Sequence, residues 1–261
     1  MFGTYIGNNK MLVKLAYNGM LSISSDDLSL MPSLVTSGSI EIPLTKFFIN
    51  QIKPDQTIID IGANVGYFTI LAAMLVGSEG KVLGFEANPT VYEFLKDNIS
   101  MNWLTKQTTL YNTAVYSKNT NLNFHSSHKF HGDSSINMRT EDANVSDFYT
   151  TISVAAIALD DQFSNLNQID LIKIDIEGGE YQAFLGMMNL IRQKKIKQII
   201  FEWNKKMLGD EHIKFISLLN ELHEKYSGHF YILDQEGNPT PTTVDTITSI
   251  EFYPFTLIKF I

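Results

Sequence analysis

The sequence contains no cysteine, which excludes disulfide bonds, thiolate metal sites and a cysteine nucleophile. This composition is compatible with a reducing compartment, and we expect a cytoplasmic protein. The N-terminal residues lack the basic start, the apolar centre and the small-residue cleavage site of a secretory signal, so we expect them to belong to the mature protein.

Basic residues are also scarce, because 20 Lys and Arg stand against 28 Asp and Glu, which gives a formal net charge of −8. Attraction to phosphates supplies most nucleic-acid affinity, so this balance disfavours a nucleic-acid partner, although it leaves room for a local basic patch. Long apolar runs are missing too. The longest uncharged stretch, residues 61–78, contains Asn64 and three glycines, and we expect no membrane span.

The pattern that is present is typical of an α/β protein. A chain of 261 residues with 44% hydrophobic residues can bury one large core. Short β-branched runs alternate with helical patterns, which predicts a doubly wound, mostly parallel seven-stranded sheet with helices on both faces. The main strands are predicted at residues 57–61, 81–85, 108–115, 169–174 and 198–203, and a C-terminal antiparallel hairpin at 229–234 and 248–261. Residues 1–45 are expected to form an N-terminal cap and residues 46–261 the main domain.

The segment TIIDIGANVGYFTI, residues 57–70, predicts a strand, a glycine turn and a helix. Gly62 and Gly66 permit a tight turn, and the free N–H groups that open the helix can bind an anionic group. The spacing is not the GxGxxG of a dinucleotide site; with Asp60 beside the turn it suits a ligand that carries both ammonium and carboxylate, as methionine does. Glu86 ends the next predicted strand, where a carboxylate can accept hydrogen bonds from two ribose hydroxyls.

Four segments, DIGANVGYFT, FEANP, ALDDQF and IDLIKIDIEGGEYQAFLG, follow one another in an order and spacing that resemble the FkbM family of methyltransferases. The resemblance covers about residues 40–205. It implies a class I methyltransferase fold, S-adenosylmethionine as donor, and O-methylation in natural-product or glycan biosynthesis. One departure is Ala87, where the family often has proline. The implied cofactor-binding residues are Asp60, Gly62, Ala63, Asn64, Gly66 and Tyr67 at the methionine part, Glu86 with Ala87 at the ribose, and Asn112 and Ala114 near the adenine. For the last two, a loop-bonding asparagine and a core alanine remain alternatives.

Three carboxylates at the ends of the fourth and fifth predicted strands are the catalytic candidates: Asp175 and Glu177 after the fourth, and Glu202 at the end of the fifth. An attacking alcohol needs alignment and a proton acceptor, and a carboxylate at a strand end could accept the proton or orient the hydroxyl. Glu180 falls in the first turn of the next helix, where we expect a structural role. The sequence Asp-Ile-Glu-Gly replaces the Asn/Asp-Pro-Pro-aromatic loop of amino-methylating relatives, which favours oxygen as nucleophile.

A metal-dependent mechanism is the alternative, in which Asp175, Glu202 and Asn204 hold Mg²⁺ through oxygen ligands; we favour the metal-free interpretation. The polar segment 116–150 predicts a substrate lid. It contains His125, His128 and His131, for which a solvated lid is favoured over a zinc site, and residues 133–135, which could touch substrate or form a turn.

The acceptor is expected to be a hydroxyl of a small molecule or carbohydrate. Two other classes remain open, a catalytically silent relative that acts as a binding protein and a nicotinamide-dependent oxidoreductase built on the same kind of sheet. The oligomeric state is left open.

Overall fold

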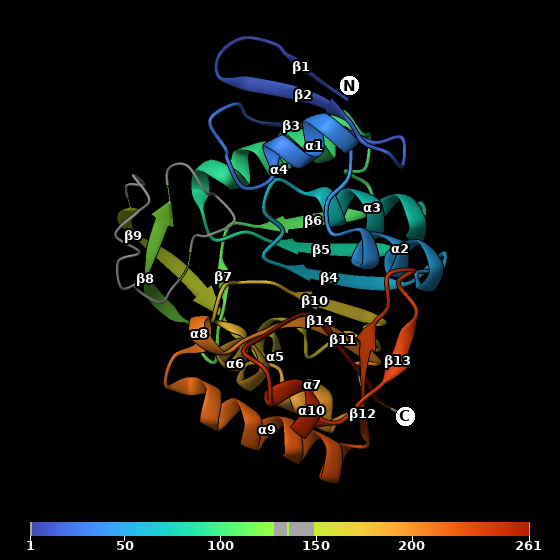
Figure 1. Ribbon diagram of the computed structural model, residues 1–261, viewed down its shortest axis with the longest axis vertical. Coiled ribbons are helices and arrows are strands. Elements are labelled where there is room, and N and C mark those ends of the chain that lie inside the picture. Colours follow the sequence, from blue (N-terminus) through green and yellow to red (C-terminus); the bar gives the residue numbers. More distant parts are fainter. Residues whose placement is uncertain (1, 128–134, 136–148, 261) are drawn as a thin grey trace.

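The computed structural model describes residues 2–127, 135 and 149–260, and its centre is one eight-stranded sheet (Figure 1). The strand order is β13-β12-β14-β11-β10-β4-β5-β6. The strands are β4 (Thr57–Ile61), β5 (Lys81–Phe85), β6 (Thr108–Tyr111), β10 (Leu171–Ile174), β11 (Gln198–Asn204), β12 (Gly228–Leu233), β13 (Pro239–Pro241) and β14 (Phe252–Phe260).

Five of these strands are parallel, and their order reverses between β4 and β10. From β4 the chain proceeds through β5 to β6 on one side, and it then returns to add β10 and β11 on the other side. In doubly wound sheets, ligands bind outside the carboxyl ends of the strands at such a reversal. The topology therefore places a binding crevice beyond Ile61, Phe85 and Ile174.

The C-terminal strands are antiparallel, as predicted. β14 lies between β11 and β12 and pairs with both in antiparallel register. The sheet exceeds the predicted seven strands by β13, a three-residue edge strand that pairs with β12. The predicted strand at 248–261 begins late, because α10 (Val244–Thr248) occupies its start.

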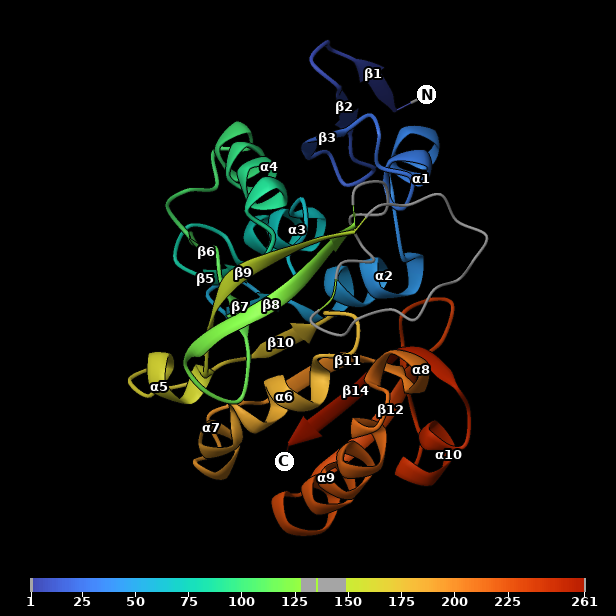
Figure 2. The same ribbon diagram turned by 90° about the vertical axis from the view of Figure 1, so that its left-hand side faces the viewer.

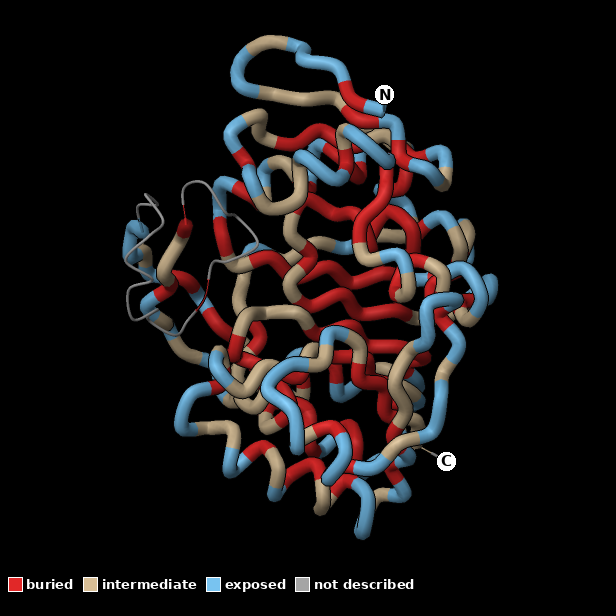
Figure 3. The backbone as a smooth tube through the Cα atoms, in the orientation of Figure 1, coloured by how far each residue is buried: buried red, intermediate tan, exposed pale blue. Residues whose placement is uncertain are grey.

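Alternate residues of the central strands face two separate layers of helices. Ile59 and its neighbours pack on α5 (Leu159–Phe163), α6 (Glu180–Leu185), α7 (Met188–Arg192), α8 (Lys205–Leu208), α9 (Glu211–Tyr226) and α10. Ile58 faces the other layer, made by α2 (Ile42–Gln51), α3 (Tyr67–Val76) and α4 (Pro89–Met101). The central strands are consequently buried on both faces (Figure 3), which explains why they are apolar almost throughout.

An N-terminal antiparallel sheet, β1 (Gly3–Tyr5), β2 (Lys10–Lys14) and β3 (Met20–Ser24), packs with α1 (Met31–Ser37) against α4. Asn98 of α4 fixes this contact, because its side chain accepts from the Ser22 N–H at 2.6 Å and donates to the Ser22 carbonyl at 2.8 Å. The expected division at residue 45 falls inside α2, and the cap and the main domain share one hydrophobic cluster. The division stays a prediction.

A second three-stranded sheet, with order β7-β9-β8, lies at the carboxyl edge of the central strands (Figure 2). It consists of β7 (Ala114–Val115), β8 (Thr120–Ser127) and β9 (Tyr149–Ile157). The prediction of one strand over 108–115 is wrong, because the chain leaves the central sheet after Tyr111 and β7 pairs with β9 instead. Part of the polar segment 116–150 is also strand, because it contains β8 and the start of β9.

His125 lies in β8, where its Nδ1 is 3.0 Å from the Thr151 hydroxyl of β9. His128, His131, Asp133 and Ser134 lie outside the described residues. Within the described part of the chain, no helix is long and apolar enough to cross a membrane.

Candidate active site

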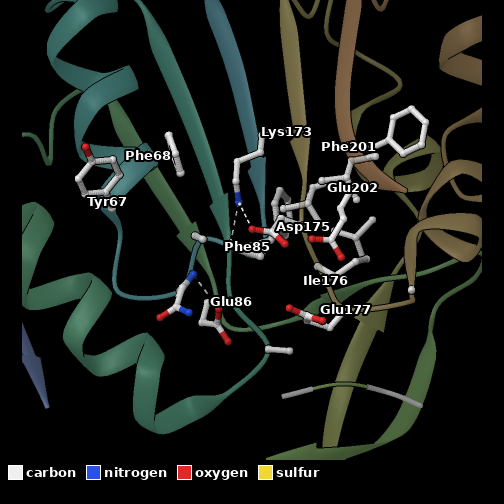
Figure 4. Close-up of a pocket in the computed structure, with 18 of the residues that line it drawn as sticks. Tyr67, Phe68, Phe85, Glu86, Lys173, Asp175, Ile176, Glu177, Phe201 and Glu202 are labelled. Carbon is white, nitrogen blue, oxygen red and sulfur yellow. Dashed lines mark hydrogen bonds and ion pairs between the residues drawn. The ribbon is translucent and has the colours of Figure 1, made fainter. Parts of the chain in front are cut away.

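A cavity of about 340 Å³ opens at the carboxyl ends of β4, β5, β10 and β11, where the strand order reverses. Figure 4 shows Glu86 on one side of it and Asp175, Glu177 and Glu202 on the other. Small-molecule sites have volumes of roughly 300–1,000 Å³, so the cavity is large enough for a ligand. Residues from the N-terminal segment and from the start of β14 complete its walls.

The glycine turn after β4 approaches the end of β10 so closely that only glycine fits. Gly62 has a φ of 76°, and a Cβ there would lie 1.8 Å from the Asp175 carbonyl oxygen. Gly66 has a φ of 98° and immediately precedes α3, and a Cβ there would lie 2.7 Å from the Leu95 side chain. The glycines that the sequence singled out are therefore required by backbone conformation and close packing.

Glu86 is buried, and its carboxylate binds backbone N–H groups of two segments, the glycine turn after β4 and the loop after β5. One oxygen accepts from the Asn64 N–H at 2.9 Å and the other from the Asn88 N–H at 2.7 Å. Burial raises the pKa of Glu86 to about 7, although these two backbone hydrogen bonds oppose the rise. A carboxylate offers about four acceptor positions, so each oxygen can accept one further hydrogen bond from a ligand hydroxyl.

Asp60 lies beneath the cavity and does not line it. Its carboxylate is fully buried, accepts from the Thr69 hydroxyl at 2.6 Å, and lies 3.4 Å from the Lys173 ammonium. The structure therefore places Asp60 where it supports the turn through other residues. Its expected place at the methionine part of a donor stays a prediction.

Lys173 of β10 is the central cation of the site, and sequence reasoning missed it. Its ammonium lies 3.4 Å from both Asp60 and Asp175 and donates to the Gly62 carbonyl at 3.2 Å (Figure 4). Burial alone would lower the pKa of Lys173, but Asp60, Asp175 and Glu41 outweigh burial and raise it above its ordinary value. One lysine thus joins the glycine turn to the strand end that carries Asp175.

The three catalytic candidates lie together at one wall of the cavity. Asp175 follows β10, its side chain is 33% exposed, and one of its oxygens is 3.4 Å from Lys173. Glu177 has a φ of 52°, and its carbonyl accepts from the Ser135 hydroxyl at 2.6 Å. Glu202 lies where the register of β11 against β14 shifts, and its Oε1 accepts from the Asn204 amide at 3.0 Å.

Asn204 does not line the cavity. Its amide donates to Glu202, and its oxygen caps α8 by accepting from the Met207 N–H at 3.3 Å. A magnesium site made by Asp175, Glu202 and Asn204 would have to use the same Asn204 oxygen that caps α8. In the part of the chain that the structure describes, no group of three or more His, Asp and Glu side chains is arranged to hold a metal ion.

The remaining predicted cofactor residues differ in their access to the cavity. Ala63, Asn64, Tyr67, Ala87 and Ala114 line it. The Tyr67 hydroxyl is already engaged, 3.1 Å from the Thr45 hydroxyl of α2. Asn112 donates to the Glu86 carbonyl at 2.8 Å and to the Ala87 carbonyl at 3.2 Å, so it holds the loop after β5 and does not line the cavity.

Glu180 has the structural position that its place in the sequence predicted. It opens α6, is fully buried, and accepts from the Ile176 N–H at 3.2 Å. Burial, together with Glu202 and Asp175, raises the pKa of Glu180 to about 8. The side chain therefore holds its proton at neutral pH and supports the loop that carries the catalytic candidates.

Comparison with known proteins places the chain in a family. The model of the methyltransferase FkbM domain matches residues 60–226, which include the glycine turn, Glu86, Lys173 and all three catalytic candidates. A tRNA (guanine(37)-N(1))-methyltransferase of Phytophthora infestans is 36% identical over 64 residues, a match that spans 24% of this chain and 15% of that protein.

Two solved structures illustrate the structural matches. An O-methyltransferase from Bacillus cereus, in complex with SAH, has 16% identity and a TM-score of 0.48, with 85% of this chain and 83% of that chain covered. A precorrin-6y C5,15-methyltransferase from Geobacter metallireducens has 13% identity and a TM-score of 0.44, with coverages of 87% and 91%. The family match covers well over half of the chain, and the chain therefore belongs to the FkbM family of methyltransferases, as its motifs predicted.

Proposed function

We propose that the chain is an O-methyltransferase that moves the methyl group of S-adenosylmethionine to a hydroxyl of a small molecule or sugar. The observation that carries this proposal is the placement of Asp175. Its partly exposed carboxylate lines the same cavity as the buried Glu86 carboxylate. This arrangement supports the proposal, because a proton acceptor at Asp175 and a ribose-binding group at Glu86 would then share one cavity.

The residues present fit the donor. Glu86 would hold the ribose, because its two oxygens are fixed by backbone N–H groups and can still accept from a pair of hydroxyls. Gly62, Ala63 and Asn64 of the turn line the cavity, so the methionine part would lie along this backbone. When bound, the donor supplies a methyl group on a positively charged sulfur, which is open to in-line displacement.

The chain's own residues then align the acceptor and remove its proton. Lys173 holds one oxygen of Asp175, which fixes the carboxylate and leaves its second oxygen for the acceptor hydroxyl. Transfer of the hydroxyl proton to that oxygen as the alcohol attacks is general base catalysis, which contributes typically 10²–10⁴-fold. Glu177 and Glu202 line the same wall and are proposed to orient the acceptor.

The walls of the cavity favour a neutral acceptor with an apolar portion. Leu30, Ile40, Phe252 and Phe255 contribute apolar surface. Lys173 is the one basic side chain among the described residues that line the cavity, and it is already paired with carboxylates. A phosphate-bearing acceptor would gain little from this surface, so an acceptor other than nucleic acid stays our proposal, as does a cytoplasmic location.

Transfer of an isotope-labelled methyl group tests the proposal. The protein is incubated with methyl-labelled S-adenosylmethionine and the small-molecule extract of its source cells, and Asp175→Asn serves as the control. We expect a labelled methyl ether, identified by the carbon shift of the methoxy group, that is absent with Asp175→Asn. Label on nitrogen or carbon would contradict oxygen as nucleophile, and donor binding with no transfer to any extract would favour the silent binding protein.

A further inference from the structure

Glu41 is a residue of the cavity wall to which the predicted site assigns no role. It is the last residue before α2, in the N-terminal segment, whereas the other carboxylates of the cavity come from the central sheet. Its backbone is left-handed, with φ 44° and ψ 60°, a conformation that favours glycine or asparagine. The side chain makes no capping hydrogen bond to α2, and the helix uses only the Glu41 carbonyl, which accepts from the Thr45 N–H at 2.9 Å.

The start of α2, which Glu41 directly precedes, is tied to the glycine turn after β4. The Thr45 hydroxyl donates to the Ile40 carbonyl at 2.8 Å and lies 3.1 Å from the Tyr67 hydroxyl. Tyr67 is the first residue of α3, directly after the turn. Glu41 is therefore positioned by the same contacts that position the turn.

Charged groups from three strands interact electrostatically with Glu41: Lys173 and Asp175 from β10 and its end, Glu202 from β11, and Asp60 from β4. Burial and then Asp175 are the largest causes that raise the pKa of Glu41 to about 8; Glu202 and Asp60 raise it further and Lys173 lowers it. At neutral pH the side chain thus carries a proton in the free protein. A cation that enters the cavity beside it would favour the ionised form and release that proton.

We propose that Glu41 is a specificity-determining residue that binds next to the positively charged sulfur of the methyl donor and so distinguishes the donor from its demethylated product. The inference rests on the proposed function. S-Adenosylmethionine has a sulfonium and S-adenosylhomocysteine a neutral thioether, while their ribose, adenine and amino acid parts are identical. Ionised Glu41 attracts the sulfonium of S-adenosylmethionine, whereas the neutral thioether of S-adenosylhomocysteine gives no such attraction. Loss of the charge on methyl transfer returns the proton to Glu41 and favours product release.

Calorimetric titration with the two ligands tests the inference. Each is titrated at pH 7 in two buffers of different ionisation enthalpy, which gives both the affinity and the number of protons released. We expect the wild type to release more protons with S-adenosylmethionine than with S-adenosylhomocysteine. Glu41→Gln should abolish this difference and lower the preference for the donor about tenfold, the effect of one charge pair of moderate strength.

Glu79→Gln is the matched control, because Glu79 is exposed, does not line the cavity, and interacts with the exposed Lys106 and the Ser78 hydroxyl. It should behave as wild type. The wild type also gives a test that needs no variant, since its preference for the donor should rise between pH 6 and pH 9 as Glu41 ionises in the free protein. A preference that stays flat with pH, or that Glu41→Gln leaves unchanged, overturns the role of Glu41. Failure of the wild type to bind either ligand contradicts the proposed function instead.

Discussion

Replacement of Lys173 by methionine tests the electrostatic design of the site. Methionine keeps an unbranched side chain, one atom shorter than that of lysine, and preserves packing against Phe68, whose ring centre lies 5.5 Å from the ammonium. It removes the charge that is 3.4 Å from both Asp60 and Asp175. Asp175 can turn to solvent, but Asp60 is fully buried and keeps only the Thr69 hydroxyl.

Removal of one partner from a buried ion pair costs about 3–5 kcal/mol, because the other charge stays buried without compensation. At roughly 2–4 °C per kcal/mol for a domain of this size, the melting temperature should fall by about 6–20 °C. Thermal and urea unfolding followed by circular dichroism measure this. The double variant Lys173→Met/Asp60→Asn should recover a large part of the loss, since it also removes the buried charge.

Lys106→Met is the matched control, because the pair of Lys106 with Glu79 is exposed and should contribute less than about 1 kcal/mol. If Lys173→Met unfolds within about 1 kcal/mol of wild type, or if the double variant is no more stable than the single one, then Lys173 and Asp60 do not form a buried ion pair.

Three further predictions follow from the turn and from the end of β10. Gly62→Ala should abolish donor binding and destabilise the protein by more than about 2 kcal/mol. Gly77 has a similar φ of 70° but open space around it, so Gly77→Ala should destabilise the protein by only about 1 kcal/mol. Similar losses for both variants would contradict the close approach of Gly62 to Asp175. Because the native protein retains the Glu180 proton while the unfolded chain loses it, stability falls as pH rises from 4.5 to about 8. Glu180→Gln should therefore stabilise the protein by up to about 3 kcal/mol at pH 7 and leave it unchanged at pH 4, and equal urea curves at pH 7 would contradict this. Asp175→Asn should reduce the turnover rate with the labelled acceptor at least ~100-fold and change donor affinity little. The wild-type turnover rate should not change when EDTA or Mg²⁺ is added. A wild-type rate in Asp175→Asn would mean that Asp175 takes no part in the mechanism.

The sequence was most informative where a strand is buried on both faces. β4 and β5 begin and end where their apolar runs predict, because every position of such a strand needs an apolar side chain or a buried partner. The run 108–115 misled because β-branched residues continue across the point where the chain changes sheets. β9 was missed because half of its residues are exposed, so its pattern resembles a polar loop.

The site was predictable where a motif fixes local geometry and not where distant charges meet. Gly62 and Glu86 each lie in a short motif, and the residue spacing within each motif is set by the single turn that follows its strand. Lys173 meets Asp60 across the sheet, and no local spacing relates them; the available signal was a lysine inside the apolar strand that leads to Asp175. Glu41 precedes every motif that was recognised, and its backbone conformation leaves no trace in the sequence.

The binding of donor at Glu86 is the central claim, and calorimetric titration of S-adenosylhomocysteine into wild type and Glu86→Gln tests it most directly. The amide keeps the size of the side chain but replaces one charged oxygen by a donor that faces the N–H of Asn64 or Asn88 and a ribose hydroxyl. We expect wild type to bind this ligand and not NAD, and Glu86→Gln to lose about 1–3 kcal/mol of binding free energy while remaining folded. Unchanged affinity in the folded variant would mean that the donor does not bind at Glu86, and tighter binding of NAD by the wild type would mean that the cavity binds a different cofactor.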